Sequence, residues 1–445
     1  MNNENIAAIA TAQGAAGVAV IRISGDSPLL IAEKIFKPSS KVEVKDFQPN
    51  VMYAGEISAD GFKDFGLCVY FKAPKSFTGE DTVEFHTHGG IAVTQGVLRK
   101  ILSSGARLAM NGEFTKRAFM NGKLSLASSE GLIDMINAES ESAVKAGYSL
   151  YREKLTGKIS SLQEKLTEAL SQIDADMDFP EEGLEETSVK KVKETLKEVL
   201  NETGKLISTF RVGRIYKNGV KVAICGKPNT GKSSLLNALL NCDKAIVSDV
   251  AGTTRDVVEG SVNLRGVKFD FFDTAGIRES SDKIETMGVD LSKKTLNSSD
   301  LVLFVFEAGN FDEKDGEVFD ILKDKPVIKV GNKTDIFSSR DFEADVYVSC
   351  KTGEGIDDLR KALYDRAVGE GLNENGEFLC EERHYYALKR AEESLTAALE
   401  SAESVDLSIL SVFIRDGWRA LGEISGKTAD EDIIDDIFKR FCVGK

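Results

Sequence analysis

Between residues 226 and 233 the sequence reads GKPNTGKS, and these residue types are suited to holding phosphate groups. The stretch follows an apolar segment at 220–225, which predicts a strand, and precedes a leucine-rich segment that predicts a helix. Its two glycines let the backbone wrap closely around phosphates and aim N–H groups at them. We expect Lys232 to place a charge between the terminal phosphates and Ser233 to bind Mg²⁺.

Two later motifs supply groups that a bound Mg²⁺ and the last phosphate need. GTTRD at 252–256 offers Thr254 as a ligand of the metal. DTAG at 273–276 follows two phenylalanines, so we expect Asp273 to reach the metal through water and Gly276 to meet the terminal phosphate.

Two motifs at the ends of expected strands could read a base. NKTD at 332–335 places Asp335 where it can accept two hydrogen bonds from guanine, whereas adenine lacks that donor pair and would be rejected by a factor of about 10⁴. SCK at 349–351 offers a backbone N–H to guanine O6. The phosphate loop followed by these four motifs in this order predicts a GTP site. The expected contacts are Asn229, Thr230, Gly231, Lys232, Ser233, Ser234, Ser248, Asp249, Val250, Ala251, Gly252, Thr253, Thr254, Asp273, Thr274, Ala275, Gly276, Asn332, Lys333, Asp335, Ser349, Cys350 and Lys351.

Hydrolysis needs groups that these motifs do not supply. Ile277 stands where a glutamine would orient the attacking water, and no arginine finger is evident. Glu285, in the acidic segment RESSDKIE, is a candidate for orienting the water, and it could equally be a solvated acid on a loop. Asn229 could hold a monovalent cation where a finger would sit, or it could simply suit a turn.

Composition limits the partners of the chain. It has 445 residues, 42% of them hydrophobic, and a formal net charge of −15, which predicts a globular protein of two or three domains. Because nucleic-acid binding usually needs a basic face, any contact with RNA must depend on a local basic patch or on a partner. Six scattered cysteines favour reduced thiols in a cytoplasm, and we expect neither a signal peptide nor a membrane span.

Several elements must position these groups. Residues 1–120 are expected to form an α+β domain, with strands at 18–25, 67–74 and 82–90 and a helix at 91–102. His86 and His88 share a face of one of these strands, which could indicate a metal site, although we expect a structural turn into the following glycines. Residues 220–370 alternate expected strands and helices.

Helical periodicity appears on both sides of this α/β block. Apolar residues recur every three or four positions over 155–177, and a second stripe begins after Pro180, which cannot continue a helix interior. Similar stripes follow the block, the last at 433–441. Because each stripe needs a partner, we expect one helical domain built from both flanks. The expected domains are 1–120 (N-terminal), 121–215 and 372–445 (the two helical segments) and 216–371 (the inserted domain).

Five stretches together resemble one family of proteins. They are SFTGEDTVEFHTHGG at 76–90, GEFTKRAFMNGK at 112–123, DFPEE at 178–182, GTTRD at 252–256 and the terminal FCVGK. In this order and over the whole chain, they are similar to the tRNA-modifying GTPases of the MnmE, or TrmE, family. The resemblance implies an N-terminal α+β domain similar to folate-binding proteins, a helical domain from two chain segments, and an inserted Ras-like P-loop GTPase domain.

The resemblance also implies ligands. It implies a potassium-activated GTPase that works through paired G domains, with K⁺ held by Asn229, Ser248, Thr253 and the Val250 carbonyl, and Mg²⁺ by Ser233 and Thr254. Glu285 would orient the water. The N-terminal domain would form a homodimer and bind a tetrahydrofolate derivative, in the 5-formyl or methylene form, through Arg22, Glu84, Lys123 and Lys445.

A partner and a reaction follow from the same resemblance. With MnmG, which carries FAD, such proteins add an aminomethyl or carboxymethylaminomethyl group to carbon 5 of the wobble uridine of certain tRNAs. This chemistry would take place in the cytoplasm, in a heterotetramer, without a membrane. Two alternatives stay open: a regulatory GTPase switch in ribosome or RNA maturation, and a folate aminomethyltransferase with an incidental G domain.

The last five residues, FCVGK, are unusual for a terminal tail. We expect a helix to end at Phe441 and Gly444 to turn the chain, so that the tail inserts at the folate site. Cys442 could then be a nucleophile that adds to a uracil or folate carbon, or a small residue that packs the tail.

Overall fold

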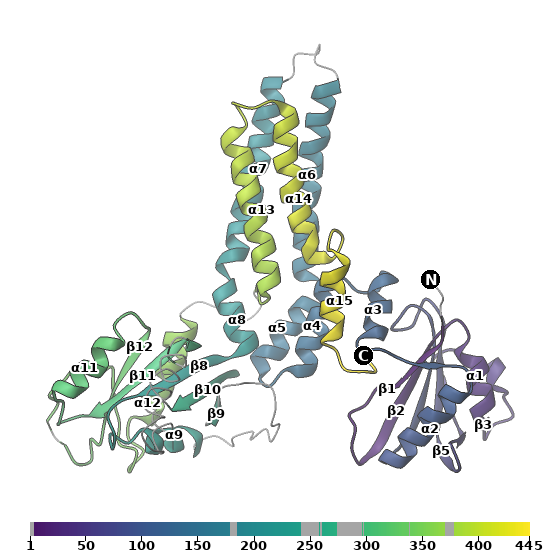
Figure 1. Cartoon of the computed structure of the whole chain (residues 1–445), viewed down its shortest axis with the longest axis horizontal. Coiled ribbons are helices and arrows are strands. Elements are labelled where there is room, and N and C mark those ends of the chain that lie inside the picture. Colours follow the sequence, from purple (N-terminus) through teal and green to yellow (C-terminus); the bar gives the residue numbers. More distant parts are fainter. Residues whose placement is uncertain are drawn as a thin grey trace, which may run out of the picture. The chain divides into compact units, whose positions relative to one another are not determined.

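The computed structural model describes residues 4–178, 185–241, 258, 260–273, 296, 298–337, 339–369 and 378–445. The chain forms two compact units. The first contains Met1–Ile133, Leu150–Lys197 and Arg390–Lys445, and the second contains Asp134–Ser149 and Glu198–Lys389. Each unit therefore combines segments that lie far apart in the sequence (Figure 1).

The N-terminal part of the first unit is a seven-stranded sheet with the order β3-β4-β5-β6-β2-β1-β7. The strands are β1 (Ile6–Ile9), β2 (Ala16–Gly25), β3 (Phe36–Pro38), β4 (Met52–Ser58), β5 (Lys63–Phe71), β6 (Asp81–Gly89) and β7 (Arg107–Leu108). Helices α1 (Pro28–Ile35) and α2 (Ile91–Ser103) pack on one face, over the fully buried Ile21, Ile23 and Phe85. Because side chains alternate along a strand, Arg22 and Glu84 lie on the opposite face.

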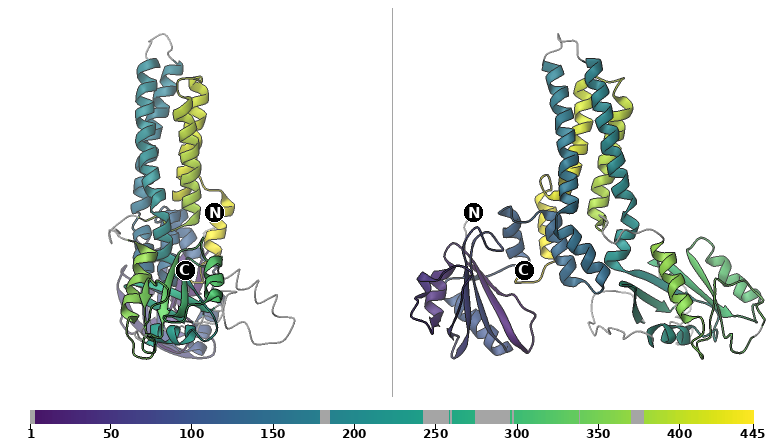
Figure 2. Two further views of the ribbon diagram at one scale, coloured as in Figure 1. Left: turned by 90° about the vertical axis from the view of Figure 1, so that its left-hand side faces the viewer. Right: turned by 180° about the vertical axis from the view of Figure 1, so that it is seen from behind.

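Helices of the first unit come from both flanks of the α/β block. They include α3 (Glu113–Met120), α6 (Lys154–Asp178), α14 (Leu407–Ser425) and α15 (Glu431–Lys439). The apolar stripe of α6 is buried from Leu155 to Ile173 except for the partly buried Leu170, whereas its last member, Met177, is 46% exposed. Helix α6 lies beside α14 (Figure 2). Trp418 Nε1 donates a hydrogen bond to Thr167 Oγ1 at 3.1 Å, and Gln163 Nε2 donates one to the Trp418 carbonyl at 2.9 Å. The expected pairing of the two flanks is thus present.

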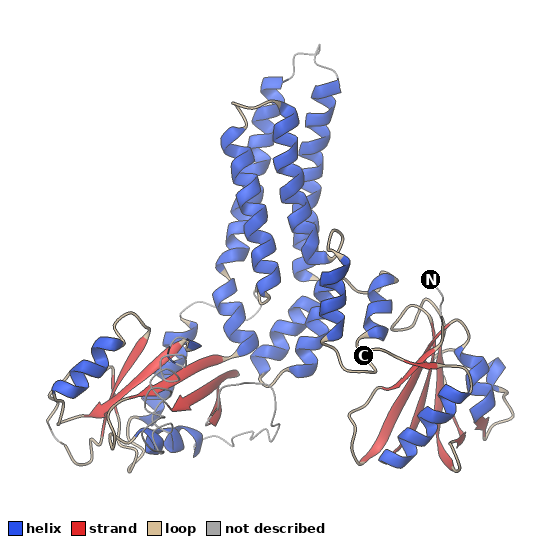
Figure 3. Cartoon of the chain, viewed as in Figure 1, coloured by secondary structure: helices blue, strands red, loops and turns tan. Residues whose placement is uncertain are grey.

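The second unit contains a six-stranded sheet with the order β13-β12-β11-β8-β10-β9, parallel except at β9 (Figure 3). The strands are β8 (Val220–Cys225), β9 (Gly260–Leu264), β10 (Val267–Asp273), β11 (Leu301–Glu307), β12 (Val327–Asn332) and β13 (Val346–Tyr347). Helices α9 (Lys232–Asn241) and α12 (Ile356–Val368) cover one face, and α11 (Glu313–Ile321) covers the other. The carboxyl ends of the parallel strands open at one edge, where the loops that follow them meet.

One partly buried ion cluster joins three segments of the second unit. Lys217, in α8 (Phe210–Asn218), lies with Nζ 2.8 Å from Asp134 Oδ1 and also pairs with Glu381. Burial, and then the charge of Glu381, raises the pKa of Asp134. Lys217 therefore pairs with two carboxyl groups that also contact each other, and its charge partly offsets the repulsion between them.

The observed elements confirm the expected fold class, with a few differences at element ends. The strand expected at 67–74 ends at Phe71, before Pro74, which has no N–H for a sheet. The last helix ends at Lys439 rather than at Phe441, and Phe441 is 2% exposed beyond it. Pro180 lies outside the described residues. No helix in the described part of the chain combines the length and apolarity that crossing a membrane requires.

Candidate functional site

The loop that follows β8 is the centre of the candidate nucleotide site. β8 is buried at the middle of the sheet, and α9 begins immediately after the loop, at Lys232. Lys232 is 6% exposed, and its Nζ donates hydrogen bonds to the carbonyl oxygens of Gly226 at 3.0 Å and Lys227 at 2.8 Å. The ammonium is therefore held over the inside of the loop, where phosphate oxygens could replace those carbonyls.

The backbone of this loop requires its glycines. Gly226 and Gly231 have φ angles of 149° and 93°, and Asn229 also has a positive φ, of 66°. A Cβ at Gly226 would collide with the carbonyl oxygen of Val305 in β11, and one at Gly231 would collide with the Asn332 side chain. The loop is thus packed against two neighbouring strand ends, which fixes its curvature.

The NKTD and SCK segments meet beside this loop. Asn332 ends β12 and is 2% exposed, and its Nδ2 donates a hydrogen bond to the Thr230 carbonyl at 2.8 Å. The buried Ser349 donates from Oγ to Asp335 Oδ1 at 2.8 Å, which holds the exposed Asp335 carboxylate in place. The Cys350 thiol lies 3.3 Å from Asn332 Oδ1, and burial raises its pKa, so it remains a thiol that donates.

Other predicted contacts are placed only in part. Ser233 and Ser234 are exposed at the start of α9, and Asp273 is the last residue of β10, opposite Ile224 in β8. Residues 248–254, 274–276 and Glu285 lie outside the described residues, so Ser248, Val250, Thr253 and Thr254 stay predictions.

Sequence reasoning missed four charged residues around the loop. Lys227 pairs with Asp312 and Asp315 at the start of α11, and Lys333 pairs with Glu307 at the end of β11. An acid directly after an apolar strand, as at Glu307, is a local signal that could have been used. The sequence around Lys227 does not indicate its ion pairs with Asp312 and Asp315, because those pairs depend on which strands are neighbours in the sheet.

A second candidate site lies on the open face of the N-terminal sheet. Arg22 in β2 and Glu84 in β6 are directly opposite in register, and Arg22 Nε donates to Glu84 Oε1 at 2.7 Å. The guanidinium lies 5.4 Å from the Phe77 ring centroid and 5.7 Å from that of Phe114. His86 Nε2 is buried, 3.5 Å from Glu84 Oε2, and makes no hydrogen bond within the described residues. This is a half-buried charged pair with aromatic walls.

Lys123 joins the same region through the loop between β5 and β6. Its Nζ donates a hydrogen bond to the Pro74 carbonyl at 3.0 Å, and its stem lies beside Gly79. Phe77, in the same loop, faces Arg22. One loop therefore connects the predicted residues Arg22 and Lys123.

The C-terminal tail lies against the N-terminal sheet within the first unit. Val443 forms an antiparallel bridge with Asn111, and the Gly112 N–H donates to the Cys442 carbonyl at 3.5 Å. Gly444 has a φ of 101°, and a Cβ there would collide with the Ile9 carbonyl at the end of β1. The tail is thus held by contacts with the backbone of neighbouring residues, whereas the Cys442 side chain is exposed.

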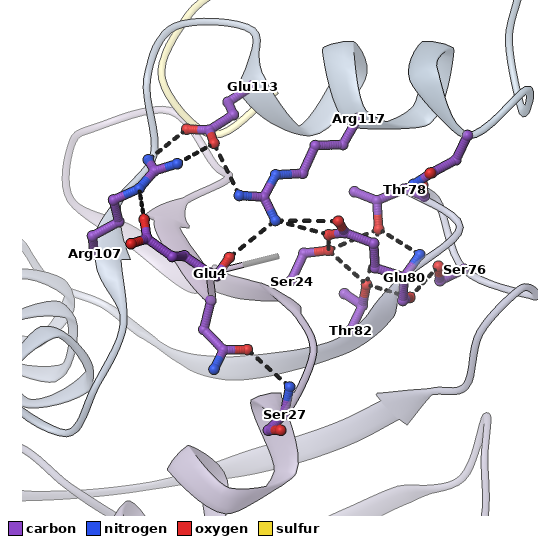
Figure 4. A network of polar contacts seen from close by, with 12 residues as sticks. Glu4, Ser24, Ser27, Ser76, Thr78, Glu80, Thr82, Arg107, Glu113 and Arg117 are labelled. Carbon is purple, nitrogen blue, oxygen red and sulfur yellow. Dashed lines mark hydrogen bonds and ion pairs between the residues drawn. The ribbon is translucent and has the colours of Figure 1, made fainter. Parts of the chain in front are cut away.

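A polar network holds the loops of this second site. Arg107 Nη2 lies 2.6 Å from Glu113 Oε1, and Arg117 lies between Glu113 and Glu80, at 3.0 Å from each (Figure 4). Ser24 Oγ donates to Glu80 Oε2 at 2.8 Å. Although burial raises the pKa of Glu113, hydrogen bonds from Arg107, the Met110 N–H and Arg117 outweigh it and lower that pKa to about 2. The network ties α3 to the loop that carries Phe77.

Two family models match the chain: "GTP-binding protein TrmE N-terminus" over residues 5–123 and "MnmE helical domain" over residues 126–442. A curated tRNA modification GTPase MnmE from Clostridioides difficile is 38% identical, over 100% of this chain and 99% of the relative. One from Thermoanaerobacter pseudethanolicus is 40% identical, over 99% of each. The chain belongs to the MnmE family. Among solved structures, the G domain of the T. maritima FeoB iron transporter matches 33% of this chain over 98% of its own length, at 27% identity and a TM-score of 0.26.

Membership of the MnmE family confirms the resemblance drawn from FCVGK and the other motifs. For such a protein, the described part of the nucleotide site fits a phosphate chain: a glycine cradle, a buried ammonium and exposed hydroxyls at the start of α9. Among the described residues, no group of three His, Cys, Asp or Glu side chains could hold a metal ion. His88 instead pairs with Asp64, its Nδ1 lying 2.6 Å from Oδ1.

Proposed function

We propose that this protein is a tRNA modification GTPase, in which GTP hydrolysis at the loop after β8 serves chemistry at the N-terminal site. The observation that carries the proposal is the buried Lys232 ammonium over a glycine cradle, beside the paired Ser349 and Asp335, in a chain of the MnmE family. The curated relatives are named tRNA modification GTPases.

In the proposed reaction, the residues of the second unit bind and orient GTP. Lys232 exchanges its carbonyl partners for phosphate oxygens, and Asp335 accepts from guanine, which excludes adenine. Mg²⁺, held by Ser233 and Thr254, and K⁺, held by Asn229, Ser248, Thr253 and the Val250 carbonyl, would neutralise charge on the phosphates. Glu285 would orient the attacking water. Two features of Asn229 support its proposed role as a K⁺ ligand: its side chain is exposed, and its positive φ places it in a loop rather than in a helix or a strand.

The N-terminal site is proposed to bind a tetrahydrofolate derivative. Glu84 would accept from the donor edge of the pterin ring, whereas Arg22 and Lys123 would attract the acidic tail of the folate. The aromatic rings of Phe77 and Phe114 beside Arg22 support this, because a pterin needs apolar walls. Lys445 would contribute from the C-terminal tail, whose backbone pairs with Asn111.

The reaction served by both sites would be addition of an aminomethyl or carboxymethylaminomethyl group to carbon 5 of the wobble uridine of tRNA. The protein would act in the cytoplasm as a homodimer with the FAD-carrying partner MnmG. Cys442, exposed on the seated tail, would be the candidate nucleophile.

Analysis of wobble nucleosides in tRNA tests this proposal. A strain without the gene should lack the modified uridine, the wild-type gene should restore it, and neither Lys232→Ala nor Arg22→Ala should. A deletion that alters ribosome assembly but leaves the wobble uridine modified would instead favour a regulatory switch. Restoration by Lys232→Ala would mean that the folate chemistry does not need GTP hydrolysis.

A further inference from the structure

Lys227, the second residue of the GKPNTGKS loop, points away from the phosphate cradle. Its Nζ lies 2.7 Å from Asp312 Oδ2 and 2.8 Å from Asp315 Oδ2. Asp312 is the N-cap of α11, and the two aspartates form a reciprocal capping box, each side chain accepting from the backbone of the other. Asp315 is fully buried, so the ammonium is paired with a carboxylate that has no access to water.

The main chain of Lys227 is turned the other way. Its carbonyl oxygen accepts from Lys232 Nζ at 2.8 Å and from Thr230 Oγ1 at 3.0 Å. Fixing the side chain on α11 therefore also fixes the carbonyl that holds the phosphate-binding lysine. Although burial lowers the pKa of Lys227, hydrogen bonds to Asp312 and Asp315 together outweigh it and raise that pKa, so the ammonium stays protonated.

The loop needs such an attachment because one of its residues is strained and its glycines are intrinsically free to adopt other conformations. Gly226 and Gly231 adopt their positive φ angles without strain, but Asn229 is not a glycine, and its φ of 66° persists only where the surroundings hold it. One end of the loop packs on the Val305 carbonyl, and the other receives the hydrogen bond from Asn332 to Thr230. Lys227 supplies a third attachment of the loop, to α11, which covers the other face of the sheet from α9.

We propose that Lys227 is a positioning residue for nucleotide binding, which holds the phosphate loop open by anchoring it to the capping box of α11. The inference rests on the proposed GTP binding and deepens it. Without the anchor, the loop samples conformations in which Lys232 and the backbone N–H groups no longer converge on one phosphate chain. Affinity for the nucleotide then falls, whereas the bound complex, in which the phosphates themselves organise the loop, hydrolyses GTP at a similar rate.

The test uses the full-length protein and methylanthraniloyl-labelled GDP and GTP. Lys227→Met keeps the aliphatic stem and removes the charge, and it should release labelled GDP faster and raise its Kd, both by about tenfold. The kcat at saturating GTP should change by less than about twofold. Lys227→Arg, which can still pair with both carboxylates, should recover most of the affinity. The matched control is Lys314→Met, which removes an exposed lysine from the first turn of the same helix and should change nothing.

Two further variants keep the proposal testable if Lys227→Met does not fold. Asp312→Asn changes only the exposed partner and should raise the Kd for labelled GDP by about two- to threefold. In an Asp315→Asn background, the loss caused by Lys227→Met should be smaller than in the wild type, because the buried partner has already lost its charge. Three results would each overturn the proposal that Lys227 anchors the loop: wild-type affinity for labelled GDP in Lys227→Met, no recovery of affinity in Lys227→Arg, or a fall in the kcat of Lys227→Met at unchanged affinity. Absence of binding by the wild-type protein would instead overturn the proposed function.

Discussion

Replacing Glu113 by glutamine should loosen the N-terminal site without touching a predicted ligand contact. The pKa of Glu113 is lowered from 4.5 to about 2, and at about 1.4 kcal/mol per pKa unit this corresponds to about 3 kcal/mol of folding free energy. In the variant, Arg107 still has Glu4 and Arg117 still has Glu80, so neither guanidinium is left without a carboxylate. We therefore expect a loss of about 2 kcal/mol.

Amide hydrogen exchange locates this loss, because a multidomain chain has no single unfolding free energy. At pH 7, peptides from α3 and from the loop at 74–80 should exchange about 30-fold faster in Glu113→Gln. Peptides from β11 and β12, in the other unit, should not change. Glu33→Gln, which alters an exposed acid on α1, is the matched control.

The pH dependence has a definite sign. A carboxylate whose folded pKa lies below its unfolded value stabilises the fold above the unfolded pKa, and that contribution disappears as the pH falls through the folded pKa. The difference between wild type and Glu113→Gln should be nearly constant well above pH 4.5, should be small at pH 2 and should vanish below it. Equal exchange of α3 peptides at pH 7, or a difference that persists undiminished at pH 2, would refute the assignment of this energy to the arginine pairs.

Four further predictions concern single residues. Gly444→Ala should displace the tail, because it combines a φ of 101° with a collision on backbone, and calorimetry should show weaker binding of 5-formyltetrahydrofolate with unchanged GTP turnover; unchanged binding would separate the tail from the folate site. GTP hydrolysis should be fast in K⁺ and slow in Na⁺, and Asn229→Ala should remove about 10³-fold of the K⁺ rate; equal rates in both salts would exclude a cation in place of the finger. Glu285→Ala should lower kcat by about 10²-fold at unchanged nucleotide affinity, and normal turnover would leave Glu285 as a solvated acid. Lys217→Met should destabilise the second unit by about 3 kcal/mol, because two partly buried and mutually repelling acids lose their shared cation, and an unchanged urea midpoint for that unit would contradict it.

Local sequence was sufficient wherever a pattern and its structure occupy the same short segment. The strand at 220–225, its loop and Lys232 were predicted because continuous apolarity, glycine spacing and a following helix are all visible within a few residues. The stripe of α6 was predicted because its period is local, and the pairing of the two flanks followed because each stripe needed a partner.

Pairs that depend on topology could not be predicted in this way. Lys227 meets Asp312 and Asp315 only because β8 and β11 are neighbours in the sheet, and nothing in the loop itself indicates which carboxylates it will reach. Arg117 and Glu80 are likewise brought together by the packing of α3 on the β5–β6 loop. Arg22 and Glu84 were named from the family resemblance, and their direct pairing across β2 and β6 is a property of the register alone.

The partnership of α6 and α14 has a consequence for how the chain is made. Thr167 and Trp418, which hydrogen-bond across these helices, are 251 residues apart in the sequence. At a synthesis rate of about 5–20 residues per second, α6 leaves the ribosome roughly 10–50 s before α14 does. The face of α6 that packs on α14 lacks that partner throughout the interval, while the strands of the inserted sheet can already pair with one another. Slowing of translation between the two helices should therefore lower the yield of intact protein more than slowing within the N-terminal sheet, which is synthesised before α6.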